Sequence, residues 1–223
     1  MTTIRDNLAE VQIQIREAIV KANRNPEDVQ IIAVTKAVSV ERTIEAIEAG
    51  LTNLGENRPE GLLTKKEAIK TRAIWHYIGS LQTRKVKQVI NEIDYLHSLD
   101  RLSLAEEIEK RAESPVKCFV QVNVSGEISK HGLTREQALE FIKSLKEFKK
   151  VQIVGLMTMA PNTEDVQVIR SVFRNLKQLQ QEIEQLGYTH APCKELSMGM
   201  SNDFEIAIEE GATFVRVGTA LVG

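Results

Sequence analysis

Short runs of β-branched and aromatic residues alternate with longer amphipathic stretches from residue 29 onward. Runs of the first kind predict strands, and apolar residues at three- to four-residue spacing predict helices. Eight strands are expected, at residues 29–34, 53–54, 74–78, 95–98, 116–124, 151–157, 194–197 and 213–217. Because strands and helices alternate so regularly, the sequence predicts successive βα units and a parallel sheet.

Seven predicted strands are followed by a helical stretch, but only residues 219–223 follow the eighth, which leaves no room for a helix. An amphipathic helix precedes the first strand and is expected to take the vacant place in an outer ring; its apolar residues are Ile4, Leu8, Val11, Ile15, Ala18 and Ile19. Eight strands and eight helices predict a (β/α)8 TIM barrel, which usually has roughly 200 to 400 residues. The alternative is a doubly wound sheet, whose Gly-rich turn is missing after the first strand, where residues 35–38 read TKAV. We therefore expect one barrel domain over residues 1–223.

The charges of the chain are nearly balanced, with 29 Lys and Arg against 31 Asp and Glu. Like charges gather only in short patches interpreted as helix surface, such as Lys65-Lys66 and Lys149-Lys150, which argues against nucleic-acid and membrane partners. Cys118 and Cys193 lie in apolar runs and are expected to be buried. The sequence starts without a signal-peptide pattern, and no apolar run approaches the ~20 residues of a membrane helix. A soluble, cytoplasmic protein is expected.

Small and polar residues follow the last two predicted strands. In a TIM barrel the loops after strands seven and eight commonly form a phosphate site. Gly199 and Ser201 precede a predicted helix that starts with a capping-box pattern at Asn202, so that free N–H groups would face an anion. Gly218 and Thr219 form a second close turn with a hydroxyl group. Either loop alone could be an ordinary strand-to-helix turn, but together they indicate a phosphate site.

Lys36 comes directly after the first predicted strand. A lysine in such a position is most often a solvated surface residue. At the catalytic end of a barrel, beside a bound phosphate cofactor, its amine can instead lose its proton and attack an aldehyde. Pyridoxal 5'-phosphate (PLP) is the cofactor that needs both a lysine and a phosphate site. The sequence therefore predicts PLP held as a Schiff base on Lys36, with its phosphate near Ser201 and Thr219.

Three further polar residues lie in or after predicted strands. Arg216 is inside an apolar strand, where an unpaired charge is costly; its partner would be a structural carboxylate or the pyridine nitrogen of PLP, kept unprotonated by the guanidinium. Asn57 could bind the phenolic oxygen of the cofactor or start the next helix. His76 alternates with Ile74 and Ile78, which fits a core histidine at least as well as a catalytic one. No metal-binding spacing appears.

Several blocks, in order and over essentially the whole chain, resemble the pyridoxal phosphate homeostasis protein family, the alanine-racemase-like single-domain PLP-binding proteins. They are AVTK at 33–36, GEN at 55–57, WHYIGSLQTRK at 75–85, QVNVSG at 121–126, GLMTMAP at 155–161, SMGMS at 197–201 and RVGT at 216–219. The resemblance implies a fold-type III PLP barrel with Lys36 as the imine lysine. It also implies that Ser201, Gly218 and Thr219 bind the phosphate and that Arg216 faces the pyridine nitrogen. The implied role is vitamin B6 homeostasis and amino and keto acid balance, without an established catalytic reaction.

Two kinds of function remain open at this stage. The first is a carrier or buffer of PLP, whose partners would be PLP-dependent apoenzymes or a regulatory protein. The second is a racemase-like PLP enzyme, which needs a second base from an added domain or a partner subunit. The chain ends soon after its last predicted strand, so no such domain is expected, although Tyr77 or His76 could be considered for that base. We expect a monomer and assign no catalytic residue.

Overall fold

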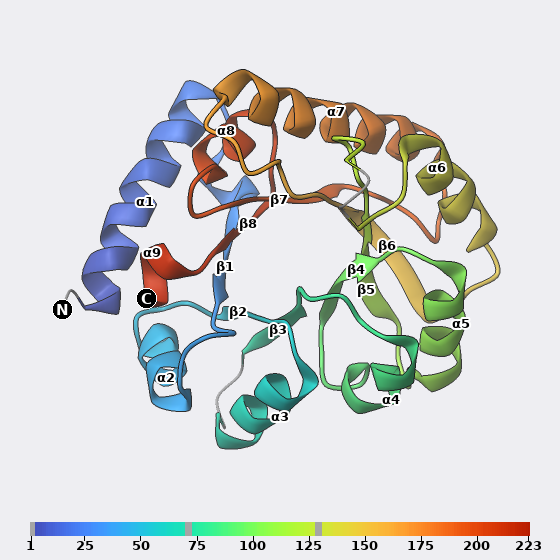
Figure 1. Ribbon diagram of the computed structural model, residues 1–223, viewed down its shortest axis with the longest axis horizontal. Helices are drawn as coiled ribbons and strands as arrows, with labels where there is room; N and C mark the ends of the chain where they lie inside the picture. Colours follow the sequence, from blue (N-terminus) through green and yellow to red (C-terminus); the bar gives the residue numbers. More distant parts are fainter. Residues whose placement is uncertain (1–2, 70–72, 128–130) are drawn as a thin grey trace.

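The computed structural model describes residues 3–69, 73–127 and 131–223. Eight parallel strands close into a barrel in sequence order (Figure 1). They are β1 Gln30–Val34, β2 Asn53–Glu56, β3 Ile74–Tyr77, β4 Tyr95–Leu99, β5 Val116–Gln121, β6 Val151–Met157, β7 Glu195–Met200 and β8 Phe214–Val217. This confirms the predicted (β/α)8 TIM barrel and each of its eight strands.

Helices surround the barrel in an outer ring (Figure 1). Those that follow the strands are α2 Val40–Glu48, α3 Pro59–Ala68, α4 Val86–Val89, α5 Leu102–Arg111, α6 Arg135–Ser144, α7 Val166–Gln185, α8 Phe204–Glu209 and α9 Thr219–Val222, and two 3-10 turns lie at Pro26–Asp28 and Thr83–Lys85. The eighth strand thus has a helix after all, but it is a single turn. Within the described residues, no helix is both long and apolar enough to cross a membrane.

The N-terminal helix, α1 Ile4–Lys21, fills the remaining place in the ring, as predicted. It begins at a capping box between Thr3 and Asp6, and its six predicted apolar residues are all buried. The helix packs against α8 and α9, and Asn7 Nδ2 donates to the carbonyl oxygen of Leu221 at 2.9 Å. It therefore covers the side of the barrel where α9 is too short to do so.

Aromatic rings meet in the barrel interior, where His76 and His97 pack against Phe214 and Phe119. Phe119 and Phe214 come from β5 and β8, which are not neighbours, and their rings lie 5.7 Å apart between centroids. Ile32 and Met157 belong to the same buried cluster. Lys36 lies in the turn that follows β1, which places it at the end of the barrel where the strands end.

Three local predictions were wrong. Lys65 is buried in α3 and not on a helix surface, and Lys149-Lys150 lie in the segment before β6 and not on a helix. The helix α8 starts at Phe204 with Asp203 as its N-cap and without a side-chain cap, because the Asp203 carboxylate instead accepts a bond from the Met200 N–H at 2.5 Å. The two cysteines are free and buried, as predicted.

Candidate functional site

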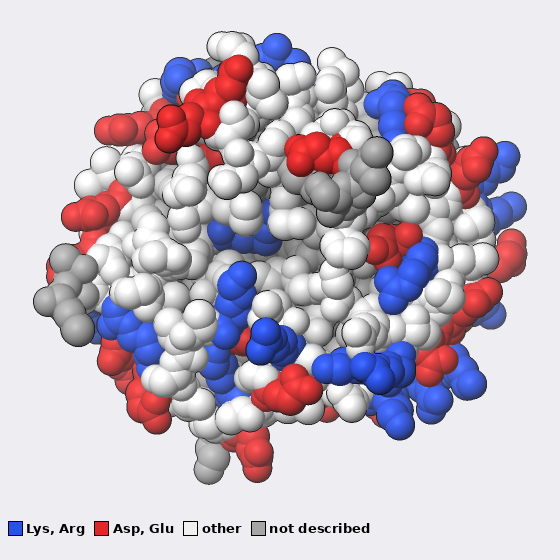
Figure 2. Space-filling view, in the orientation of Figure 1, with Lys and Arg blue, Asp and Glu red and all other residues white. Residues whose placement is uncertain are grey.

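The residues predicted to bind the cofactor lie at the carboxyl ends of four strands that are consecutive around the barrel, β2, β1, β8 and β7. Lys36 follows β1, Asn57 follows β2, Ser201 follows β7, Arg216 is in β8, and Gly218 and Thr219 follow β8. Figure 2 shows this face hollowed near its centre, with Lys and Arg side chains in and beside the hollow. The fold therefore brings all six residues to one side of one mouth.

Lys36 is exposed, and among the described residues its ammonium group has no hydrogen bond or ion pair. The residue before it is buried and firmly held. The carbonyl oxygen of Thr35 accepts a bond from Lys65 Nζ at 2.5 Å, and its hydroxyl donates to Glu56 Oε1 at 2.6 Å. Lys65 and Glu56 form an ion pair at 2.6 Å, in which the side chains are 6% and 1% exposed. The free amine thus extends from a fixed backbone.

The loops after β7 and β8 meet at the mouth. The Gly218 N–H donates to Ser201 Oγ at 3.3 Å, and Thr219 is exposed as the first residue of α9. Gly199 has φ +92°, and a Cβ there would lie 2.6 Å from the Cβ of Ala207. Only glycine therefore allows this close approach of the end of β7 to α8. The result is two joined loops with backbone N–H groups and hydroxyls, the donor types that bind a phosphate.

Asn57 does not start the following helix, which was one of its two predicted roles. The N-cap of α3 is Arg58, and Pro59 is the first helical residue. Asn57 is partly buried, and its backbone packs so tightly against Gly79 that a Cβ on that glycine would lie 2.9 Å from the Asn57 Cα. Binding of a cofactor oxygen by the Asn57 amide stays a prediction.

Arg216 is buried, at 5% exposure. Its Nη1 donates to Ser197 Oγ at 2.6 Å and its Nη2 to the Thr158 carbonyl oxygen at 3.0 Å. Burial lowers the pKa of Arg216 to about 10, while the charge of Asp203 acts in the opposite direction, so the guanidinium stays charged at neutral pH. In the described part of the chain no carboxylate lies within ion-pair distance of it. Two of its five N–H donors are used on neutral oxygens, which leaves donors for a ligand.

A chain of neutral hydrogen bonds continues from Arg216 into the barrel. Ser197 Oγ lies 2.9 Å from His97 Nδ1, His97 Nε2 lies 2.9 Å from His76 Nδ1, and His76 Nε2 lies 2.9 Å from Asn53 Oδ1. Arginine can only donate, so the Ser197 hydroxyl is free to donate to His97, and each imidazole then donates onward to end at the Asn53 oxygen. We call the series from Ser197 through His97 and His76 to Asn53 the histidine chain.

Neither histidine of this chain is charged at neutral pH. Burial, with a contribution from Lys117, lowers the pKa of His76 to about 3, and burial also places the pKa of His97 well below its usual value. Tyr77 points into the layer between barrel and helices, where burial and the charge of Glu60 raise its pKa to about 12. His76 is therefore a hydrogen-bonded core residue, and Tyr77 remains protonated.

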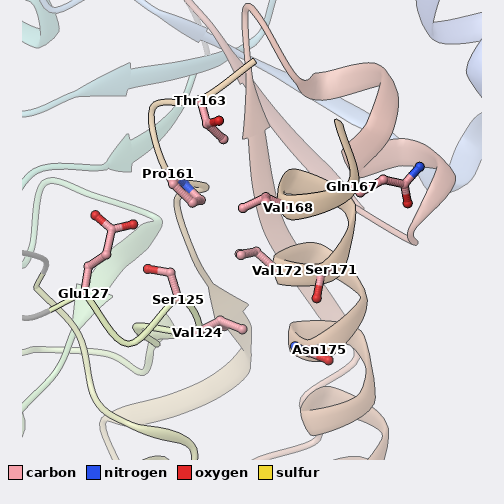
Figure 3. Close-up of a pocket in the computed structure, with 10 residues that line it drawn as sticks. All are labelled: Val124, Ser125, Glu127, Pro161, Thr163, Gln167, Val168, Ser171, Val172 and Asn175. Carbon is pink, nitrogen blue, oxygen red and sulfur yellow. The ribbon is translucent and has the colours of Figure 1, made fainter. Parts of the chain in front are cut away.

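A separate pocket lies on the same face, between α7 and the loops after β5 and β6 (Figure 3). Its volume is about 550 Å³, and its lining is Val124, Ser125, Glu127, Pro161, Thr163, Gln167, Val168, Ser171, Val172 and Asn175. In Figure 3, Val168 and Val172 point toward the loops that carry Pro161 and Ser125, whereas Gln167 points away. The pocket contains none of the residues predicted to bind the cofactor.

Sequence reasoning missed the residues that support the mouth from below. His97 could have been found, since it points inward from β4 two residues beyond Tyr95, the partner of His76 on β3, and two inward histidines on neighbouring strands suggest a bonded pair. Ser197 was placed in the seventh predicted strand and in the SMGMS block, but no role was assigned to it. The Glu56–Lys65 pair had no sequence signal, because its two members belong to different elements.

Comparison with known proteins identifies the family to which this chain is similar. Residues 7–223 match the family model described as alanine racemase, N-terminal domain. A pyridoxal phosphate homeostasis protein of Aquifex aeolicus is 40% identical over 98% of this chain and 96% of its own. The structure of PipY from Synechococcus elongatus with PLP bound is 30% identical, with a TM-score of 0.87, and covers 99% of this chain and 100% of that one. An alanine racemase of Clostridium difficile shares the fold at 16% identity and a TM-score of 0.78, covering 99% of this chain and 56% of that one.

Proposed function

This chain belongs to the pyridoxal phosphate homeostasis proteins, within the alanine racemase N-terminal domain family, and we propose that it binds PLP and acts in PLP homeostasis as one barrel domain. The match to the named relatives runs over nearly the full length of both chains. One observation carries the proposal. The exposed Lys36, the joined Ser201–Gly218 loops and the charged Arg216 lie at one mouth, and they offer an amine, a phosphate site and a cation.

Each residue then has a defined role toward the cofactor. Lys36 would supply the amine that forms the Schiff base with the aldehyde carbon of PLP, with loss of one water. Ser201, Gly218 and Thr219 would bind the phosphate, Arg216 would donate to the pyridine nitrogen and Asn57 would bind the phenolic oxygen. Bound PLP supplies an electrophilic aldehyde carbon and a ring that withdraws electrons. Because Arg216 stays charged, it keeps the pyridine nitrogen unprotonated and weakens that withdrawal.

These roles favour a carrier over a racemase-like enzyme. A weak electron sink stabilises a carbanion poorly, whereas reversible imine formation needs no carbanion. The residues considered for a second base are also unsuitable, since His76 is occupied on both nitrogens and Tyr77 lies outside the barrel interior. We propose that the protein holds PLP on Lys36, out of reach of other amines, and releases it to PLP-dependent apoenzymes.

The test is the visible absorbance spectrum of the protein with added PLP, before and after borohydride reduction, followed by peptide mapping. Wild type and the control Lys66→Ala should show an imine band and carry the reduced label on Lys36, whereas Lys36→Ala should show neither. Label on another lysine, or no imine in wild type, would contradict the proposal. Alanine racemisation and half-transamination by the PLP-loaded protein are measured alongside. Rapid turnover that depends on Lys36 would show that the protein is an enzyme and not a carrier.

A further inference from the structure

The peptide group between Thr35 and Lys36 is held by residues from two other elements. Its carbonyl oxygen accepts a bond from Lys65 Nζ of α3 at 2.5 Å and a second bond from the Val38 N–H at 3.0 Å. On the same residue, the Thr35 hydroxyl donates to Glu56 Oε1 of β2 at 2.6 Å, and the Thr35 N–H donates to the Gly55 carbonyl oxygen at 3.0 Å. Every polar group of Thr35 therefore has a partner at the carboxyl end of the sheet or in α3.

The ion pair that makes two of these contacts is enclosed by protein. Glu56 and Lys65 are 1% and 5% exposed, and Glu56 Oε1 accepts from both Lys65 and Thr35. The second carboxylate oxygen lies against Gly61, since a Cβ there would be 3.0 Å from Oε2. A buried ion pair is a poor source of stability compared with apolar residues of the same size. Stability therefore does not explain why this ion pair contacts Thr35.

We propose that Glu56 and Lys65 are positioning residues for Lys36, a role that rests on Lys36 being the lysine that binds PLP. A peptide unit is planar, so the Lys65 ammonium that fixes the Thr35 carbonyl also fixes the nitrogen and the Cα of Lys36. The Lys36 side chain has a flexible four-carbon stem and no partner among the described residues. Only the starting point of the side chain is set by the fold, and the ion pair sets it together with the backbone bonds of Thr35 to Gly55 and Val38.

The consequence concerns formation of the imine and not affinity for the rest of the cofactor. Condensation of the Lys36 amine with the aldehyde, with loss of one water, needs the nitrogen at the aldehyde carbon. Displacement of a reacting group by about 1 Å can slow a reaction about a hundredfold. The phosphate loops and Arg216 lie on β7 and β8, away from α3, and are expected to keep their geometry when the ion pair is removed.

The decisive variant is the double replacement Glu56→Gln/Lys65→Met, which removes both charges together and so leaves no unpaired buried ion. We expect a folded protein in which the rate constant of imine formation, followed by absorbance after mixing with PLP, falls about ten- to a hundredfold. Pyridoxamine 5'-phosphate carries an amine in place of the aldehyde and cannot form the imine. Its affinity should be unchanged, which a general distortion of the site would not allow.

The matched control is Glu92→Gln/Lys66→Met, which removes the partly exposed ion pair of the next lysine on the same helix and should form the imine at the wild-type rate. If the buried double variant also does so, or if its affinity for pyridoxamine 5'-phosphate falls in parallel, the positioning role is overturned. Wild-type protein without label on Lys36 would overturn the proposed function itself.

A second pair of variants keeps the test available if the double variant does not fold. Thr35→Val preserves the shape of the residue but removes the hydroxyl that donates to Glu56, whereas Thr35→Ser retains it. We expect imine formation to slow several-fold in Thr35→Val and to stay near the wild-type rate in Thr35→Ser. Equal rates in these two variants would overturn the role of Glu56.

Discussion

Two networks of polar side chains lie beneath the mouth of the barrel, and they differ in net charge. Beside β1 and β2, the buried carboxylate of Glu56 cancels the charge of Lys65, and both contact Thr35. Beside β7 and β8, Arg216 contacts only neutral oxygens, and the histidine chain behind it is neutral throughout. The first network thus fixes a backbone without adding charge, whereas the second retains a positive charge for a ligand. We infer that the first network positions Lys36 and that the second binds the cofactor ring.

The largest effect is expected where the ion pair is broken on one side only. Lys65→Met leaves the Glu56 carboxylate buried at 1% exposure without its cation. Removal of one partner of a buried pair costs about 3–5 kcal/mol, so the free energy of unfolding measured in urea should fall by that amount. The double variant Glu56→Gln/Lys65→Met should recover most of the loss. Equal losses in the single and the double variant would contradict the view that the charges mainly balance each other.

The histidine chain predicts a dependence of stability on pH. Burial lowers the pKa of His76 from 6.5 to about 3. Between these values the unfolded chain binds the additional proton, so the contribution of His76 is complete above pH 6.5 and is lost as the pH falls toward 3. At pH 5 the loss from His76 alone is roughly 2 kcal/mol, and His97 adds to it. Urea unfolding at a series of pH values measures this slope.

Two variants assign that slope to the histidine chain. His76→Gln removes one of the groups that take up a proton on unfolding and should flatten the dependence between pH 5 and 6.5. His190→Gln is the control, because His190 lies outside the barrel interior, with its Nε2 2.9 Å from the Ile142 carbonyl oxygen. A slope that persists unchanged in His76→Gln would show that the acid sensitivity has another origin.

A smaller effect is expected where one link of the chain is removed. Ser197→Ala takes away the oxygen that accepts from Arg216 and the hydroxyl that donates to His97. Unsatisfied buried groups cost about 1–3 kcal/mol, so the free energy of unfolding should fall by that amount. The absorbance spectrum of bound PLP should also shift, because Arg216 loses a hydrogen-bond acceptor. Ser98→Ala is the matched control, since the Ser98 hydroxyl is buried and has no partner within the described residues. Equal destabilisation by the two variants would contradict the role of the chain.

Much of the fold could be predicted because its signals are local. Strand runs and helical spacing are properties of neighbouring residues, and they gave all eight strands and the apolar face of α1. The start of α8 was misplaced because Asp203 bonds to the Met200 N–H, which replaces the expected cap at Asn202. That bond depends on a turn whose geometry the residue pattern does not specify.

The residues of the candidate site also differ in whether the sequence could predict them. Lys36, Ser201 and Gly218 could be placed because strand ends in a parallel barrel share one face. The groups beneath them could not, since Ser197 and His97 are separated by 100 residues and meet only in the closed barrel. Lys65 stands beside Lys66 in a charged stretch of α3, so the sequence pattern does not distinguish the buried lysine from the exposed one.

That pair of adjacent lysines gives the smallest predicted effect. Lys66 Nζ lies 3.0 Å from Glu92 Oε2, with side chains 36% and 43% exposed. Exposed pairs contribute less than about 1 kcal/mol, so Lys66→Met should lower the free energy of unfolding by no more than that, and less in high salt because of screening. The chemistry of the substitution and the helix are the same as for Lys65→Met. A loss comparable to that of Lys65→Met would mean that burial does not separate the two ion pairs, and the contrast between a neutralised and a charged network would lose its physical basis.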